Sequence, residues 1–455
     1  MAEGCHPPAP RGAPAGFRPP PPGGGRPPPP VVPGGGGTSA PAGEADAGMG
    51  VGRPAGAPEV RVLRPEDRAA FADLQRRGYA SGGGTMEPAP EVTVPEGDDG
   101  ARGCFADGRV VAGAYLKPYR TWWGADEIPM ESVGGVVALP EARRRGHTAA
   151  LLEGLLADMR ARGVPISTIT TPFSYAFYRQ MGWEYAFPRL RATLPPRSLA
   201  GLGGDGGEAR FVRAEPGSDW FPADVDRVYR EVMRRRYQGA AARPPDLWRA
   251  HLGGERTYAY VWYRADGPRG YLIAGPGRSG NLRVRELFAL DRAAFGGLCG
   301  LLANLDSQAD ALEWDMPPDA RPDLLVAEQH NLQVAWRPEG MLRIVDLPAA
   351  VAARGAPGLS GTVRLRLEDA QAPWNRGPFD LRWAGGHPEV RPAEGDPEGG
   401  AEAAMDQRTF AQIYAGTLTP AAAAGLGRAE IGETAMRVLS AAYGTGRPPL
   451  LLEHH

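Results

Sequence analysis

Residues 131–183 constrain the fold of this chain most, because their pattern sets the order of several consecutive elements. The apolar, β-branched run at residues 133–139 predicts a buried strand. A basic turn follows, and then a helix whose apolar residues recur at the spacing of one buried face until Gly163 ends it. Residues 166–171 predict a second strand, and residues 174–181 predict a short helix.

The basic turn has the sequence RRRGHT and occupies residues 143–148. Unpaired backbone N–H groups and the helix dipole favour a phosphate at the start of a helix. Arginine side chains add charge-assisted hydrogen bonds to such an anion. The turn therefore predicts a phosphate-binding site.

The pattern R-x-x-G-x-T of this turn resembles the R/Q-x-x-G-x-(G/A) pyrophosphate loop of GNAT N-acetyltransferases, which bind acetyl-CoA. Thr148 stands where that family usually has glycine or alanine. With the following helix and strand, and with YRQMG at residues 178–182, the whole stretch is similar to the Eis (enhanced intracellular survival) family. That family carries a triple-arginine turn and a Y-x-R-F-G-like segment.

The resemblance covers nearly everything after residue 59 and implies an α+β protein with tandem GNAT-like domains followed by a sterol-carrier-protein-like C-terminal domain. The expected ranges are a disordered Pro/Gly-rich tail at 1–58, a GNAT acetyltransferase domain at 59–195, a second GNAT-like domain without a pyrophosphate loop at 196–340, the sterol-carrier-like domain at 341–451 and an expression-tag remnant at 452–455. The tail is predicted from its composition, which cannot bury enough apolar surface to offset the entropy of ordering.

One glycine pattern points to another function. GPGRSG at residues 275–280 fits the dinucleotide fingerprint G-x-G-x-x-G, whose mechanism needs a helix directly after the glycines. Here Asn281 leads into a predicted strand, which favours a hairpin loop.

The resemblance implies an N-acetyltransferase that uses acetyl-CoA to acetylate the amine of a small molecule, aminoglycoside-like or otherwise, by direct attack on the thioester. Tyr178 occupies the position of the family's catalytic tyrosine and would protonate the departing thiolate. Tyr175, one turn earlier, is the alternative. The expected base is the C-terminal carboxylate, at His455 if that end is native and otherwise near Leu451.

Cofactor contacts are expected from the central strand, the basic turn and the start of the short helix. These residues are Val136, Val137, Ala138, Arg143, Arg144, Arg145, Gly146, His147, Thr148 and Ser174. The acceptor is expected between the first helix and the central strands, at Tyr79, Ser81, Glu131 and Gly135. Ser81 stands roughly where the Eis family tends to have an acidic residue, so recognition of a polycationic amine stays open.

Composition bounds the remaining partners. The 51 basic and 53 acidic residues nearly balance, so no global field draws the chain to nucleic acid or an anionic membrane. The three cysteines, Cys5, Cys104 and Cys299, have neither a disulfide nor a metal-ligand spacing and favour a reducing, cytoplasmic location. Family members assemble as hexamers, so the resemblance implies a homohexamer. The alternatives are a GNAT scaffold redirected to another acyl-CoA or secondary-metabolite reaction and a non-catalytic ligand-binding protein.

Overall fold

The structure is a computed structural model that describes residues 58–80, 100–171, 175–204, 206–212, 221–252, 256–395 and 401–453. Several expectations lie outside these residues. They concern the Pro/Gly-rich tail up to residue 57, Ser81, Ser174 and His455. Tyr79 lies in a helix, but its side chain is outside the described part of the chain.

The first domain begins with a strand, a helix and a hairpin, as the sequence predicts. Its elements are β1 (Glu59–Val62), α1 (Arg68–Ala80), β2 (Ala101–Ala106), β3 (Arg109–Trp123), β4 (Asp126–Ala138), α2 (His147–Ala161), β5 (Ile166–Thr170), α3 (Tyr175–Gln180) and β6 (Glu184–Leu194). Strands β1 to β4 are antiparallel neighbours, and β5 runs parallel to β4. Helix α2 buries the apolar face that the sequence predicts, through Leu151, Leu152, Leu155, Leu156 and Met159.

The second domain repeats the arrangement of strand, helix and parallel strand. Its elements are β7 (Glu208–Val212), α4 (Ala223–Arg236), β8 (Gln238–Ala241), α5 (Pro245–Leu252), β9 (Tyr258–Arg264), β10 (Gly267–Pro276), β11 (Leu282–Ala289), α6 (Arg292–Ala303), β12 (Leu312–Met316) and β13 (Gln333–Ile344). Strand β11 pairs with β12 in parallel. The glycine-rich residues 275–280 join the antiparallel strands β10 and β11, so the hairpin prediction is confirmed.

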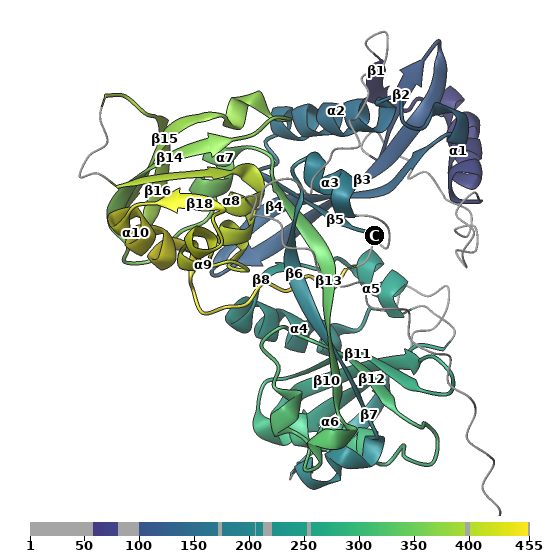
Figure 1. Cartoon of the computed structure of the whole chain (residues 1–455). Coiled ribbons are helices and arrows are strands. Elements are labelled where there is room, and N and C mark those ends of the chain that lie inside the picture. Colours follow the sequence, from purple (N-terminus) through teal and green to yellow (C-terminus); the bar gives the residue numbers. More distant parts are fainter. Residues whose placement is uncertain are drawn as a thin grey trace, which may run out of the picture. The chain divides into compact units, whose positions relative to one another are not determined.

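The strands of both domains form one continuous sheet (Figure 1). Its order is β1-β2-β3-β4-β5-β13-β6-β12-β11-β10-β9-β7, with β8 paired to β3. Strand β13 joins the two parts, because it pairs with β5 through residues 340–344 and with β6 through residues 333–342. Residues 341–344, which the sequence assigns to the start of the C-terminal domain, therefore belong to this sheet.

The C-terminal domain has its own five-stranded sheet, in the order β16-β15-β14-β17-β18. Its elements are α7 (Leu347–Ala352), β14 (Gly361–Glu368), β15 (Gly377–Ala384), β16 (His387–Pro392), β17 (Glu402–Asp406), α8 (Gln407–Ala415), α9 (Pro420–Gly425), β18 (Ala429–Ile431) and α10 (Glu433–Tyr443). Short 3₁₀ helices occur at Pro65–Asp67, Pro140–Ala142, Pro196–Leu202, Pro322–Leu324, Gln329–Asn331 and Pro373–Asn375.

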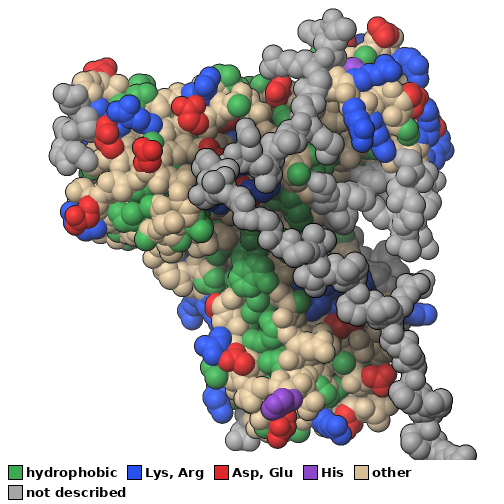
Figure 2. All heavy atoms as spheres, viewed as in Figure 1, with side chains coloured by type: hydrophobic (Ala, Val, Ile, Leu, Met, Phe, Trp, Pro, Cys, Tyr) green, Lys and Arg blue, Asp and Glu red, His purple; other side chains and the backbone are tan. Residues whose placement is uncertain are grey.

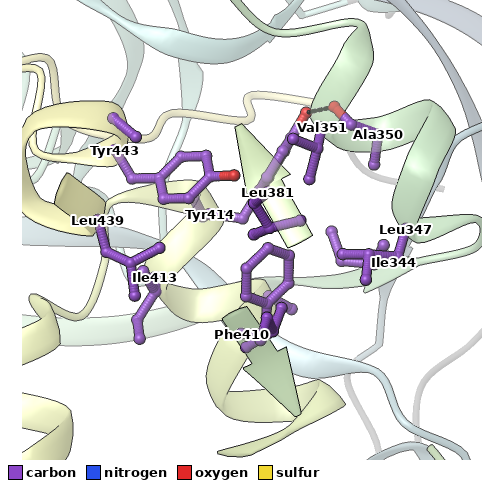
Figure 3. Packing of buried hydrophobic residues seen from close by; sticks show 14 of the residues in the cluster. Ile344, Leu347, Ala350, Val351, Leu381, Phe410, Ile413, Tyr414, Leu439 and Tyr443 are labelled. Carbon is purple, nitrogen blue, oxygen red and sulfur yellow. Dashed lines mark hydrogen bonds between the residues drawn. The ribbon is translucent and has the colours of Figure 1, made fainter. Parts of the chain in front are cut away.

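Aromatic side chains fill the core of the C-terminal domain. Phe410, Tyr414 and Tyr443 are buried side by side, and the Tyr414 hydroxyl donates a hydrogen bond to the Ala350 carbonyl (Figure 3). The inward residues of β14 and β15 that alternate in the sequence are buried in the same cluster. This packing forms a continuous hydrophobic core.

Two surface features of the described residues bear on partners. Apolar side chains gather along the middle of the face shown in Figure 2, where β6 and β13 run, and Val334 and Trp336 of β13 are 48% and 56% exposed. No helix of the described chain has both the length and the apolar character needed to cross a membrane.

Candidate active site

Strands β4 and β5 diverge at the centre of the first domain. They pair only from Met130 opposite Ile166 to Ser132 opposite Thr168, while β4 continues to Ala138. Beyond Ser132 the edge of β4 that faces away from β3 has no strand partner among the described residues. Its backbone groups can therefore bond to a ligand.

A bulge at Gly135 shapes this open stretch of β4. Tyr115 pairs with Gly134 and Gly113 with Val137, so β4 carries one extra residue there. Gly135 has φ +59°, and a Cβ at this position would lie 2.4 Å from Cδ2 of Tyr115. The Gln75 side chain donates a 3.3 Å hydrogen bond to the Gly135 carbonyl. Gly135 thus acts through its backbone shape, because only glycine fits both the conformation and the space.

The basic turn leads into α2 without a side-chain cap. Gly146 is the N-cap residue with φ +83°, and no side chain that the structure describes accepts a hydrogen bond from the first turn. Arg144 and Arg145 are exposed and form no hydrogen bond or ion pair with any residue that the structure describes. Arg143 differs, since its Nη2 donates a 2.9 Å hydrogen bond to the Gly78 carbonyl at the end of α1. The turn therefore offers an uncapped helix terminus and two outward guanidinium groups to an anion.

The corresponding helix of the second domain is closed to an anion. Helix α6 follows β11 as α2 follows β4, but its N-cap residue Asp291 accepts a 2.9 Å hydrogen bond from the Ala294 N–H. This carboxylate occupies the place that a phosphate would take. The two domains thus differ in the one feature that anion binding requires.

His147 is the first residue of α2, and its side chain is buried. Burial lowers the pKa of its imidazole, and the charge of Arg145 lowers it further. A neutral His147 adds no positive charge to the turn, so its contribution is its backbone N–H, like that of half-buried Thr148.

The two candidate tyrosines of α3 have different surroundings. The Tyr175 hydroxyl donates a hydrogen bond to the Pro338 carbonyl of β13, and burial followed by the charge of Glu339 raises its pKa. Tyr178 is half-buried against the core of the first domain, and its ring lies 5.3 Å from that of Phe177. The Tyr175 hydroxyl therefore helps to join α3 to β13, and the assignment of the acid to Tyr178 stays a prediction.

Glu131, expected at the acceptor site, has another role. Its side chain is buried and forms an ion pair with Arg162, whose Nη2 lies 2.7 Å from Oε2 and whose Nη1 bonds to Oε1. Hydrogen bonding to Glu131 raises the pKa of Arg162. We do not assign Glu131 to acceptor binding, because its charge is neutralised within the protein.

The C-terminal tail lies against the second domain. The Leu451 carbonyl accepts a 2.9 Å hydrogen bond from Nη2 of Arg189. Glu453 is buried, and its Oε1 lies 2.8 Å from Nε of Arg243. Arg243 also binds Glu286 through both terminal nitrogens, at 3.2 and 2.7 Å.

Sequence reasoning missed this charged cluster around Arg243. Its members are 43 and 210 residues apart along the chain, so no local spacing reveals it.

Comparisons with known proteins agree with this architecture. Two family models, each described as an acetyltransferase (GNAT) domain, match residues 59–186 and 239–344, and a sterol carrier protein domain model matches residues 347–452. An uncharacterized N-acetyltransferase of Streptomyces avermitilis is 27% identical over 354 residues, which are 71% of this chain and 82% of that protein. Another from Streptomyces coelicolor is 26% identical over 445 residues, with 86% and 98% covered.

Solved structures show the same fold over most of the chain. A GCN5-related N-acetyltransferase from Kribbella flavida is 27% identical with a TM-score of 0.72, and 88% of this chain and 99% of that chain are covered. Eis1 from Mycobacterium abscessus is 24% identical with a TM-score of 0.70, and the covered shares are 87% and 100%.

The chain is thus an acetyltransferase enzyme built from two GNAT domains and a sterol carrier protein domain. Its likeness to Eis1 from Mycobacterium abscessus is a likeness of fold over most of the chain.

Proposed function

We propose that the first domain binds acetyl-CoA and transfers its acetyl group to the amine of a small molecule. The uncapped start of α2 carries this proposal, because its N–H groups and the exposed Arg144 and Arg145 suit a pyrophosphate. Arg143 would position the turn through Gly78. The open edge of β4 at Val136, Val137 and Ala138 would face the thioester.

The chemistry follows from these positions. The amine nitrogen attacks the thioester carbonyl carbon, and the electron pair of the C=O bond moves onto oxygen. Backbone N–H groups of residues 136–138 would stabilise that oxyanion. The C–S bond then breaks, and the thiolate takes a proton from the Tyr178 hydroxyl, which solvent later replaces. The proton lost by the amine goes to a carboxylate, in the Eis-like interpretation the C-terminal one, at His455 or near Leu451.

A paired substitution on α3 tests this assignment. Thiol release from acetyl-CoA is measured with a panel of small-molecule amines, and the products are identified by mass spectrometry. Tyr178→Phe should lower kcat roughly a hundredfold or more, because it removes the general acid. Its affinity for acetyl-CoA, measured by calorimetry, should not change.

Tyr175→Phe is the matched control on the same helix. It loses a hydroxyl that bonds to Pro338, so it should keep kcat and lose about 1 kcal/mol of stability. Equal kcat values for the two variants, or a large loss of acetyl-CoA affinity in Tyr178→Phe, would refute the role of Tyr178.

We also propose a cytoplasmic homo-oligomer, a hexamer by family resemblance. The exposed apolar residues Val334 and Trp336 support an interface between copies, because residues 333–338 of β13 pair with β6 alone among the described strands. Cys104 and Cys299 are buried thiols without a disulfide, which suits a reducing compartment.

A further inference from the structure

A pocket of about 300 Å³ lies beside the C-terminal tail in the second domain. Strands β6, β11 and β12, helix α5 and residues Leu452 and Glu453 form its wall. Four arginines line it, namely Arg189, Arg243, Arg283 and Arg285. Because buried positive charges are costly when unpaired, these guanidinium groups need negative charge nearby.

The carboxylates of the pocket are already shared among arginines. Asp315 lies 2.7 Å from Nη2 of Arg191 and 2.8 Å from Nη2 of Arg283. Glu286 binds Arg243 and also accepts a 2.7 Å hydrogen bond from the Tyr271 hydroxyl. Glu453 makes the remaining pair with Arg243. These three acids therefore neutralise Arg243, Arg283 and Arg191.

Two arginines remain without a carboxylate partner among the described residues. Arg189 is 4% exposed; its Nη2 donates to the Leu451 carbonyl, and its Nε has no hydrogen-bond partner in the described chain. Arg285 is half-buried and bonds to no described side chain or carbonyl. Burial lowers the pKa values of both, and the neighbouring charge of Arg283 also lowers that of Arg285. A bound anion would offset the burial of these two charges and the repulsion between Arg285 and Arg283.

The backbone of β11 directs Arg285 to this pocket. Ile273 pairs with Glu286 and Ala274 with Val284, so Arg285 is the extra residue of a β-bulge. In a regular strand, neighbouring side chains point to opposite faces, whereas a bulge can bring both to one side. As a result Arg285 and Glu286, adjacent in sequence, line the same pocket.

Contacts through β13 and β3 connect this pocket to the candidate active site. The Tyr175 hydroxyl of α3 bonds to Pro338, and Arg337 pairs with Arg189 in the next strand. The charge of Glu339 acts on both Tyr175 and Arg189. Tyr119 of β3, opposite Met130 of β4, is half-buried and within electrostatic reach of Glu453. The lining of the pocket is thus linked to α3 through β13 and to β4 through β3.

We propose that this pocket binds the anionic group of the acceptor, a carboxylate or phosphate held by Arg189 and Arg285. The inference rests on the proposed acetyl transfer and narrows its acceptors to amines that also carry a negative charge. A polycationic amine does not fit, because it would add positive charge where two guanidinium groups already lack partners.

The first experiment needs no acceptor. Thermal unfolding is followed with inorganic phosphate, and with potassium chloride at equal ionic strength, for the wild type, Arg285→Gln and Arg278→Gln. Arg278 is an exposed arginine in the loop before β11 and lies outside the pocket, so it is the matched control. Phosphate should stabilise the wild type and Arg278→Gln more than Arg285→Gln, which keeps only the proposed phosphate site at the start of α2. Equal stabilisation of all three proteins, or of none, would overturn the site.

The second experiment assigns the anion to the acceptor. The kcat/KM for acetylation is compared between phenylalanine and phenethylamine, which differ by one carboxylate, and between glucosamine 6-phosphate and glucosamine. In the wild type at least one anionic member should be preferred, and Arg285→Gln should reduce that preference roughly tenfold, the effect of one charge-assisted hydrogen bond. Preference in both pairs for the amine that lacks the anionic group would refute the assignment.

Two further outcomes separate the competing explanations. Acetyl-CoA affinity is measured on the same samples, so failure of the donor site is distinguished from failure of the pocket. Phosphate could instead stabilise the protein only after its last two residues are removed. A carboxylate of this chain would then fill the pocket, and the role of the pocket in acceptor binding would be overturned.

Discussion

Replacing Arg243 by methionine tests the charged cluster that holds the C-terminal tail against the second domain. Arg243, Glu286 and Glu453 are each at most 2% exposed at the side chain, and the arginine joins both carboxylates. Arg243→Met leaves two buried carboxylates without their shared partner, which costs about 3–5 kcal/mol. For a protein of 455 residues the loss corresponds to a fall in Tm of roughly 3–5 °C.

Differential scanning calorimetry measures this change, and Glu286→Gln provides the comparison. In the double variant Arg243→Met/Glu286→Gln one of the stranded charges is absent, so its Tm should exceed that of Arg243→Met alone. A fall below about 2 °C for Arg243→Met, or a lower Tm for the double variant, would refute this account of the cluster.

The same cluster predicts how stability depends on pH. Burial alone would raise the pKa of Glu286, but Arg243 and His251 outweigh it and hold the pKa well below its usual range. A lowered folded-state pKa stabilises the protein above the ordinary pKa of glutamate and loses that effect as the pH falls toward the folded value. The Tm advantage of the wild type over Glu286→Gln should therefore be constant near neutrality and shrink below about pH 4.5.

Two further predictions concern the β4 bulge and the surface of β13. Gly135→Ala forces a side chain into φ +59° and against Tyr115, so it should cost about 2–4 kcal/mol and weaken acetyl-CoA binding. Gly108→Ala, at φ +71° with open space around it, should cost only the backbone part and keep acetyl-CoA affinity; equal losses in both would contradict the role of the clash. Trp336→Glu should shift the mass measured by light scattering toward the monomer, because it places a charge on the proposed interface; an unchanged oligomer would exclude this surface.

The sequence was most informative where the structure is local. The strand, turn and helix at residues 131–161 follow from an apolar run, a basic glycine turn and one helical face, and these signals agree with the tertiary packing. The hairpin at residues 275–280 was equally predictable, because a strand rather than a helix follows the glycines.

Contacts between distant residues could not be predicted. Glu131 has the negative charge expected of a side chain that binds a basic acceptor. Only the placement of α2 against the sheet brings Arg162 close enough to neutralise it. The pairing of β13 with both β5 and β6 joins strands about 150 residues apart or more.

Titration calorimetry with acetyl-CoA tests the central claim most directly, because it requires no knowledge of the acceptor. The structure predicts one site per chain, since α2 begins without a cap whereas Asp291 closes α6. Arg144→Gln should weaken that site, and Arg278→Gln should not. Two sites per chain, or binding that is unaffected by Arg144→Gln, would contradict the account.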